Sequence, residues 1–296
     1  MLPASITKVP IGRLRRMPIF DVCWRFFLKK LFATAAVMVA FGNVAYGADF
    51  AFKAPIVASL YDWTGFYAGG TVGGAWSKAD VNLTTVNGGN ALYNPAQIPG
   101  LNAIGSTGVA GSSAIFGGKL GYNQQWASFV LGVEGDISSW RLNKAVTTTG
   151  NPFDIILPPA TVNFATFNTT LSTSWLATVR GRVGFAADRA LFYATGGAAF
   201  ADIHFANTYL GHSGFGAGNE GEANTASQAK AGWAAGAGAD YALTRNWIVS
   251  VEYLHVDLGS ISASGLVTTG NANTATMSFT TRLRSDIVRG GISYKF

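Results

Sequence analysis

The sequence contains one cysteine, Cys23, and few charged side chains, which make up 12% of its 296 residues. Cys23 lies in a front segment that has the features of a secretory signal, so the exported chain contains no thiol. Disulfide bonds and thiolate metal sites are therefore excluded. Such a chain must be stabilised by burial and by backbone pairing alone.

The exported chain also lacks an excess of charge of either sign. Of the 21 Lys and Arg residues, seven precede Ala48, and of the 15 acidic residues only Asp21 does, which leaves 14 of each. The formal net charge of +6 therefore belongs to the front segment. This removes the argument for nucleic acid or for an acidic partner, which a basic chain would otherwise suggest.

The front segment, residues 1–47, has the three parts of a secretory signal. A basic stretch runs through Lys30, an apolar run covers 31–41, and small residues stand at Ala45 and Gly47. The alternative is a transmembrane helix, but the uncharged stretch that ends at Gly47 is shorter than the roughly 20 apolar residues that a spanning helix needs. We predict cleavage after Gly47.

The signal leaves two further parts of the chain. Residues 48–62 carry Pro55 and no clear alternation, and we predict a short periplasmic lead-in there. Residues 63–296 are long enough for one barrel domain. Met1 and Met17 both stay open as the start, without consequence for the exported protein.

No long apolar run follows the signal, which argues against a helical membrane protein. Apolar side chains instead alternate with small or polar ones over about ten residues at a time, as in strands with one face on lipid and one on an interior. In FVLGVEGDISSW, for example, Leu131 and Val133 alternate with Glu134 and Asp136. The fifth segment is apolar on both faces, so its facing stays open. The eight segments are 66–76, 113–123, 129–140, 174–185, 191–200, 230–243, 246–257 and 285–296.

The number and spacing of these segments predict the fold. Eight strands are an even number, which lets both ends of a closed antiparallel barrel lie on one side. The connections after the second, fourth and sixth segments are short, whereas the others run to roughly 20 to 35 residues, beyond ordinary loop lengths. Short periplasmic turns and long external loops are typical of outer-membrane barrels. We predict an all-β fold, an eight-stranded antiparallel up-and-down transmembrane β-barrel in the bacterial outer membrane.

Tryptophans predict two girdles at the membrane interfaces, where indole rings are favoured. Trp233 is the exception, because it lies further inside its segment. The expected outer girdle is Trp76, Trp140 and Trp175, and the expected periplasmic girdle is Trp63, Trp126 and Trp247.

Three blocks of sequence resemble a known family. They are YDWTGFYAGGTVGGAW (61–76), GWAAGAGADYALTRNWIVSVEYLHVDLG (232–259) and IVRGGISYKF (287–296). As a set they resemble the small porin-like outer-membrane proteins of alphaproteobacteria, the RopB-type surface proteins. The resemblance implies an abundant outer-membrane barrel associated with envelope integrity and with surface contact with hosts. Some relatives are described as haemin binders, many are labelled porins, and the family supplies no catalytic residues.

Charged residues on the inward faces are balanced, with four of each sign. An eight-stranded barrel is just wide enough for its own side chains to fill it, so these groups suggest a structural plug of paired charges. A narrow ion pathway lined by the same groups is the alternative. The predicted network is Lys119, Glu134, Asp136, Arg180, Arg182, Asp240, Glu252 and Arg289.

The histidines raise two further hypotheses, each weighed against an ordinary polar surface residue. His204, Tyr209 and His212 lie in the third long connection, and His and Tyr both serve as axial haem ligands. His255 and Asp257 lie two apart and so share one face of a strand, where a histidine oriented by a carboxylate activates a serine such as Ser285 or Ser227. We nevertheless expect no cofactor and no enzymatic role.

The last residues predict how the barrel is recognised for assembly. Ile292, Tyr294 and Phe296 place an apolar or aromatic side chain at every second position from the end, which resembles the signal read by the barrel assembly machinery. The expected partners are this machinery, outer-membrane lipid and lipopolysaccharide, and host or envelope molecules at the long loops. The sequence therefore predicts a structural, surface-exposed barrel, with a porin or a haemin-binding receptor as the alternative.

Overall fold

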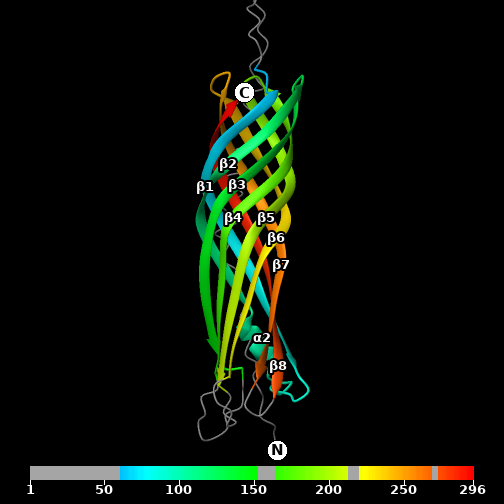
Figure 1. The fold of residues 1–296 in the computed structure, drawn as a ribbon, viewed down its shortest axis with the longest axis vertical. Helices are drawn as coiled ribbons and strands as arrows, with labels where there is room; N and C mark the ends of the chain where they lie inside the picture. The colour runs from blue at the N-terminus through cyan, green and yellow to red at the C-terminus, as the bar shows by residue number, and fades with distance from the viewer. Residues whose placement is uncertain (1–60, 153–163, 213–219, 269–272) are drawn as a thin grey trace, which may run out of the picture. The chain divides into compact units, whose positions relative to one another are not determined.

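The computed structural model describes residues 61–152, 164–212, 220–268 and 273–296. These ranges form eight strands and one short helix (Figure 1). In none of them is a helix long and apolar enough to cross a membrane. The elements are β1 (Gly65–Asn87), α2 (Ile98–Gly105), β2 (Thr107–Trp126), β3 (Phe129–Gly150), β4 (Phe164–Ala187), β5 (Ala190–His212), β6 (Glu220–Ala242), β7 (Trp247–Thr268) and β8 (Thr274–Lys295).

Each strand pairs antiparallel with its neighbours in the chain, and β1 pairs with β8, so the sheet closes on itself. The prediction of an eight-stranded antiparallel barrel is confirmed. The C-terminus lies at one end of the barrel and α2 lies at the other (Figure 1). Short turns join β2 to β3, β4 to β5 and β6 to β7 at the end that holds the C-terminus. We call this the turn end, and the end with α2 the loop end.

Near the turn end, apolar side chains face outward and polar ones inward, as expected of strands in lipid. On β8, for example, Val288 is exposed and Arg289 is buried. On β5, whose facing the sequence left open, Phe192 faces outward and Leu191 inward. The outward apolar surface, here called the lipid-facing belt, comprises Phe66, Val72, Trp76, Phe116, Leu120, Trp126, Phe129, Leu131, Val133, Ile137, Val179, Val183, Phe185, Phe192, Phe200, Trp233, Tyr241, Trp247, Val251, Val288 and Ile292.

Toward the loop end the alternation continues with its polarity reversed. On β8, Met277 and Phe279 are buried inside, whereas Thr280 and Arg282 face outward. An outer wall surrounded by water takes polar side chains, and the apolar ones then turn inward to form a core. The strands are therefore apolar outside in one half and apolar inside in the other.

This reversal explains a correction to the predicted loops. The strands are 20 to 24 residues long, so much of each predicted long loop is strand. The outward apolar face of each strand ends where the polarity reverses, so an apolar–polar alternation of the lipid-facing kind marks only the half of the strand near the turn end. Part of the long connection after the third segment also belongs to β4, where Phe167 is fully buried, while residues 153–163 lie outside the described ranges.

The barrel separates into two sheets toward the loop end. β2 pairs with β3 only from Ile115 to Trp126, and β6 pairs with β7 only from Trp233 to Ala242, within the described strands. Beyond these points β7, β8, β1 and β2 stay paired together, as do β3, β4, β5 and β6. Register shifts in β3, β4 and β7 occur at this level, where bulges bend strands.

The two sheets enclose an apolar core. Phe279 of β8 lies 6.1 Å from Phe167 of β4 and 6.3 Å from Phe205 of β5, measured between ring centroids. Leu101 of α2 is fully buried in the same core, and no room is left for a side chain on Gly105 beside Leu83. The loop end is therefore packed like a β-sandwich, with α2 inserted into it.

Two of the predicted girdle tryptophans do not face the membrane, so this part of the prediction is wrong. Trp140 and Trp63 are both fully buried. Trp140 shares the inward face of β3 with Glu134 and Asp136, and alternation alone would have placed it there. Trp63 precedes β1, donates a hydrogen bond to Asp188 O (3.1 Å), and closes the turn end from inside.

The predicted signal, residues 1–47, and most of the lead-in, 48–62, lie outside the described residues. Tyr61, near the end of the lead-in, crosses the turn end of the barrel. Its backbone N–H donates to Asp188 Oδ1 (3.0 Å) and its hydroxyl donates to Arg245 O (3.2 Å). Burial raises the pKa of this hydroxyl to about 12, so it stays protonated as a donor.

Candidate functional site

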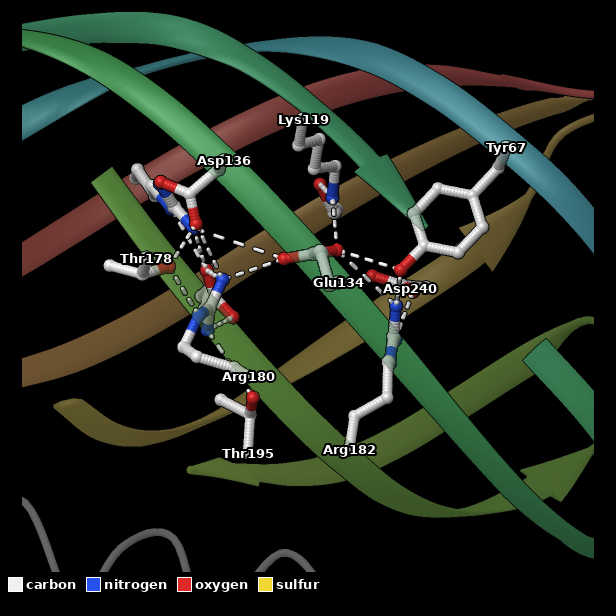
Figure 2. Close-up of polar contacts among 12 residues, drawn as sticks. Tyr67, Lys119, Glu134, Asp136, Thr178, Arg180, Arg182, Thr195 and Asp240 are labelled. Carbon is white, nitrogen blue, oxygen red and sulfur yellow. Dashed lines mark hydrogen bonds and ion pairs between the residues drawn. The ribbon is translucent and has the colours of Figure 1, made fainter. Parts of the chain in front are cut away.

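The interior of the barrel, next to the turn end, holds a network of charged side chains (Figure 2). The structure brings together all eight charged residues that the sequence placed on inward faces, and each is less than a tenth exposed. They come from six strands, β2, β3, β4, β6, β7 and β8. Because four are cationic and four are anionic, the network carries no formal net charge.

Arg180 is the centre of the network. Its Nη1 donates to Glu252 Oε1 (2.7 Å), and its Nη2 donates to Glu134 Oε1 (2.6 Å) and Asp136 Oδ2 (3.0 Å). Its Nε donates to the hydroxyl of Thr178 (2.9 Å). One guanidinium therefore joins carboxylates from β3 and β7 across the lumen, and its side chain is fully buried.

Arg289 of β8 connects two of the same carboxylates from another side. Its Nη1 lies 2.9 Å from Asp136 Oδ1, and its Nε lies 2.8 Å from Glu252 Oε2. Asp136 and Glu252 thus each accept hydrogen bonds from two arginines. Charge-assisted bonds of this kind are stronger than neutral ones, and they fix the side chains that share them.

A second group of contacts extends the network toward the turn end. Arg182 Nη2 donates to Asp240 Oδ2 (2.6 Å), and Arg182 Nη1 donates to the hydroxyl of Tyr67 (2.8 Å). That hydroxyl donates in turn to Glu134 Oε2 (2.8 Å). Lys119 Nζ lies 3.7 Å from the same Glu134 oxygen. Tyr67 therefore joins the two halves of the network.

Sequence reasoning missed the tyrosines of the network. Besides Tyr67, Tyr193 of β5 contributes its ring, which lies 3.8 Å below the Arg182 guanidinium. Both rings lie against glycines, because a side chain on Gly121 would collide with Tyr67 and one on Gly238 with Tyr193. An inward tyrosine opposite glycines is a pattern that the sequence contains. Because Tyr67 belongs to β1 and Tyr193 to β5, all eight strands contribute a side chain to the lumen network.

Buried apolar side chains lie on both sides of the charges. At the turn end Trp63, Val130, Leu191 and Ile248 form one buried cluster. At the loop end the core between the two sheets fills the interior. The charged network thus lies between two clusters of buried apolar side chains.

Comparison with known proteins identifies the family. A family model described as an outer membrane protein beta-barrel domain matches residues 46–296. The chain belongs to this family of outer-membrane barrels. The predicted location in the outer membrane is confirmed.

Similar relatives of this outer-membrane barrel are immunogenic proteins of Brucella. The 31 kDa outer-membrane immunogenic protein of Brucella melitensis is 27% identical over 271 residues, covering 88% of this chain and 98% of that protein. The 25 kDa outer-membrane immunogenic protein of Brucella abortus is 26% identical over 277 residues, covering 91% and 99%. The predicted resemblance to small alphaproteobacterial barrels is thereby confirmed.

Among solved structures, the attachment invasion locus protein Ail of Yersinia pestis is similar at 14% identity and a TM-score of 0.31, covering 79% of this chain and 99% of that one. The outer membrane protease OmpT of Escherichia coli is similar at 10% identity and a TM-score of 0.38, covering 78% and 97%.

The haem ligand set considered for this outer-membrane barrel is not brought together. His204 and Tyr209 both lie in β5 rather than in a loop, but on opposite faces. The His204 side chain is 53% exposed on the outer wall, whereas Tyr209 is buried inside and its hydroxyl accepts a hydrogen bond from Tyr93 (3.0 Å). His212 ends β5, and its side chain lies outside the described part.

The structure also separates His255 from its predicted catalytic partners. His255 Nδ1 lies 2.8 Å from Asp286 Oδ1 on the outer wall, and Asp257 pairs instead with Arg282 (2.7 Å). The hydroxyl of Ser285 is buried and lies 3.0 Å from that of Ser77. No cluster of three or more His, Cys, Asp or Glu suited to a metal ion occurs among the described residues.

The three residues of the predicted assembly signal lie on one outward face. Ile292, Tyr294 and Phe296 are 49%, 39% and 74% exposed, continuous with the lipid-facing belt. The backbone N–H of Phe296 donates to Phe66 O (2.9 Å), and its ring packs edge-on against Tyr294. The last residue is thus held against β1, next to the closing pair of strands.

Proposed function

We propose that this outer-membrane barrel is a structural, surface-exposed protein whose interior is plugged. The observation that carries the proposal is the charge-balanced network centred on Arg180, which joins side chains across the whole lumen. A channel lined by one sign of charge attracts its counter-ion, but in this network each charged side chain already has a partner of opposite charge. No bond-breaking chemistry is assigned to these groups.

Packing supports the same proposal. An ion on its way through would have to part the Arg180 contacts and also displace the apolar layers around Trp63 and Phe279. Each unpaired buried charge costs several kcal/mol, so opening the network is far above thermal energy. The gap next to the network is too narrow for a water molecule, and it is lined by Tyr67, Lys119, Asn123, Asp240, Ile248 and Ser293.

Surface exposure is proposed from orientation. In outer-membrane barrels the short turns face the periplasm, which places the loop end of this barrel outside the cell. There the outward side chains are mostly polar and uncharged, as at Ser260, Ser262 and Thr280. The relatives named immunogenic proteins agree with a barrel exposed at the cell surface. Host or envelope molecules would contact this end, while lipid and lipopolysaccharide surround the belt.

Conductance in planar bilayers tests the plug. The purified protein should insert without stable conductance steps, at concentrations where a porin in the same bilayer conducts. Insertion is verified independently by protection of the belt from protease. A stable ohmic conductance of the inserted wild-type protein would overturn the proposal and favour the porin alternative.

A further inference from the structure

A serine, a histidine and an aspartate form a chain of hydrogen bonds on the outer wall of β5 and β6. Ser227 Oγ lies 2.7 Å from His204 Nδ1, and His204 Nε2 lies 3.2 Å from Asp202 Oδ2. Ser227 stands opposite His204 in the register of the two strands, and Asp202 is two residues from His204 on the same face. Sheet pairing therefore holds all three side chains in place.

Asp202 fixes the tautomer of the histidine. Its carboxylate also accepts hydrogen bonds from Ser174 N (3.0 Å), Ser174 Oγ (2.5 Å) and Trp175 N (3.2 Å), at the bulge of β4. An ionised carboxylate only accepts, so His204 must donate from Nε2. In the neutral ring, Nδ1 then accepts from Ser227, which is the relation of a general base to a nucleophile. Compared with the serine proteases, the two ring nitrogens exchange roles.

The other described histidine shows that this arrangement is not a general feature of the outer wall. His255 contacts Asp286, and Asp286 also accepts a hydrogen bond from the hydroxyl of Tyr253 (2.7 Å). Among the hydrogen bonds of the described residues, none joins His255 to a serine. The sequence hypothesis considered Ser227 or Ser285 beside His255, whereas the register pairs Ser227 with His204, because pairing across strands cannot be derived from spacing.

The position of the three residues indicates what they would act on. On β5 they follow Phe200, and on β6 Ser227 precedes Trp233; these two exposed aromatic residues mark the edge of the lipid-facing belt. Aromatic residues at the end of a belt lie at the membrane interface, and the acyl esters of lipids lie at that depth. The His204 side chain is half-exposed, so a lipid has direct access.

The outer wall nearer the turn end has an apolar depression. Between Phe200 and Phe192 the outward residues of β5 are small, and a shallow groove of about 490 Å³ lies there. Leu131, Val183, Ala194 and Gly196 line it, among others. The groove lies over β3, β4 and β5, nearer the turn end than His204 on β5.

The edge of β6 next to Ser227 is not paired with β7. β6 has no β7 partner between Asn224 and Gly232 in the described register. In an antiparallel ladder, residues turn their N–H groups to alternate sides, so one N–H within a residue of Ser227 points to this free edge. Such a donor stabilises the oxyanion that forms when an ester carbonyl is attacked.

We propose that Ser227, His204 and Asp202 form a hydrolytic site for the acyl ester of an outer-leaflet lipid. Ser227 Oγ attacks the carbonyl carbon while its proton passes to His204 Nδ1. The tetrahedral intermediate then breaks its bond to the lipid alkoxide, which takes that proton, and leaves an acyl-serine. Water attacks the acyl-serine, gives its proton to His204, and releases the fatty acid as the proton returns to Ser227. Asp202 positions the ring and stabilises its cationic form.

The test uses full-length protein purified from the outer membrane of a host without its own outer-membrane phospholipase. One arm incubates it with phospholipid micelles and the other with purified lipopolysaccharide, and mass spectrometry identifies the released acyl chains. A fluorophosphonate probe reports the nucleophile through a covalent adduct mapped to its peptide. Release in either arm, with an adduct on Ser227, is the expected result.

Variants separate catalysis from folding. Ser227→Ala should lose both adduct and release, and His204→Ala should lower both about 100-fold or more, with partial rescue by added imidazole. Asp202→Asn should lower kcat with KM unchanged. His255→Ala and Ser262→Ala are matched controls on the same wall and should behave as wild type. Heat-dependent gel mobility verifies that each variant is a folded barrel.

The proposal stands only if release and adduct both depend on Ser227 and on His204. Folded wild-type protein that shows neither would overturn it, as would a rate in Ser227→Ala equal to the wild-type rate or an adduct that forms equally without His204. In each of these cases the three residues are a polar cluster on the wall.

Discussion

Arg180 shows how much one side chain decides inside this barrel. Its guanidinium satisfies Glu134, Asp136 and Glu252 at once, each within 3.0 Å. A buried ion pair adds little stability when compared with an apolar replacement of the whole group, but removing one partner leaves an excess of buried charge of the opposite sign. The loss of Arg180 should therefore cost more than the loss of any exposed charge.

Arg180→Ala should lower the free energy of unfolding by about 3 to 5 kcal/mol, because three buried carboxylates lose their shared cation. Urea unfolding in detergent micelles measures this. Arg189→Ala, in the exposed turn between β4 and β5, is the matched control and should change stability by less than about 0.5 kcal/mol. Lower pH should recover part of the loss, since protonation removes the uncompensated negative charge; a loss that does not change with pH would contradict the network interpretation.

At the scale of elements, each strand serves two environments. β8 presents Val288 and Ile292 to lipid but turns Phe279 and Leu283 into a core. Along one strand the 2-residue alternation continues unchanged, but the apolar side chains change from the outer face to the inner face. The last outward residues of β8 and Phe296 are those predicted to be recognised by the assembly machinery.

Phe296→Ala, or one residue appended after Phe296, should impair assembly more than it impairs the finished barrel. The ring is 74% exposed, so its removal takes little packing from the folded state. Outer-membrane levels of the variant, set against its urea midpoint after purification, measure the two effects separately. Lys295→Ala, whose ammonium contacts Asp62 O, is the neighbouring control. Normal outer-membrane levels of both Phe296 variants would refute the prediction.

At the scale of the whole molecule, the barrel is closed near the turn end and divides into two packed sheets near the loop end. The division leaves edges on β2, β3, β6 and β7, and the apolar core between the sheets, including Phe279 and Leu101, holds them together. Stability of the loop end should thus depend on contacts between the sheets, in addition to hydrogen bonds within each.

Phe279→Ala should cost about 3 to 5 kcal/mol, because its ring packs between Phe167 and Phe205 of the opposite sheet and a cavity would remain. Leu266→Ala, an exposed apolar residue of β7, is the control. Hydrogen exchange should show increased opening of the loop end, with the lipid-facing belt unchanged. Equal protection of the loop end in Phe279→Ala and wild type would contradict this packing.

The sequence by itself determined the closed eight-stranded barrel, its family and the eight charges that face its interior. These features follow from the alternation of side chains between the two faces of a strand, which does not depend on how the strands pair. They also follow from the requirement that strands in lipid be apolar on one face. The inward position of Trp140 could also be predicted from the sequence, because it is an even number of residues from Glu134 and so lies on the same face of the strand.

Only the tertiary structure decided which groups meet across strands. Tyr67 joins Glu134 to Arg182. His204 contacts Ser227, whereas the expected pair of His255 and Asp257 does not form. Both outcomes depend on strand register and on closure of the barrel, which spacing along the chain does not give. The tertiary structure also decided where the loops begin. An alternating segment puts its apolar side chains outward where lipid surrounds the barrel and inward where water does, so the strands extend beyond the membrane-facing pattern. The sequence gives the alternation along a strand. Which half of the strand lies in lipid and which lies in water is decided only when the eight strands assemble into the barrel.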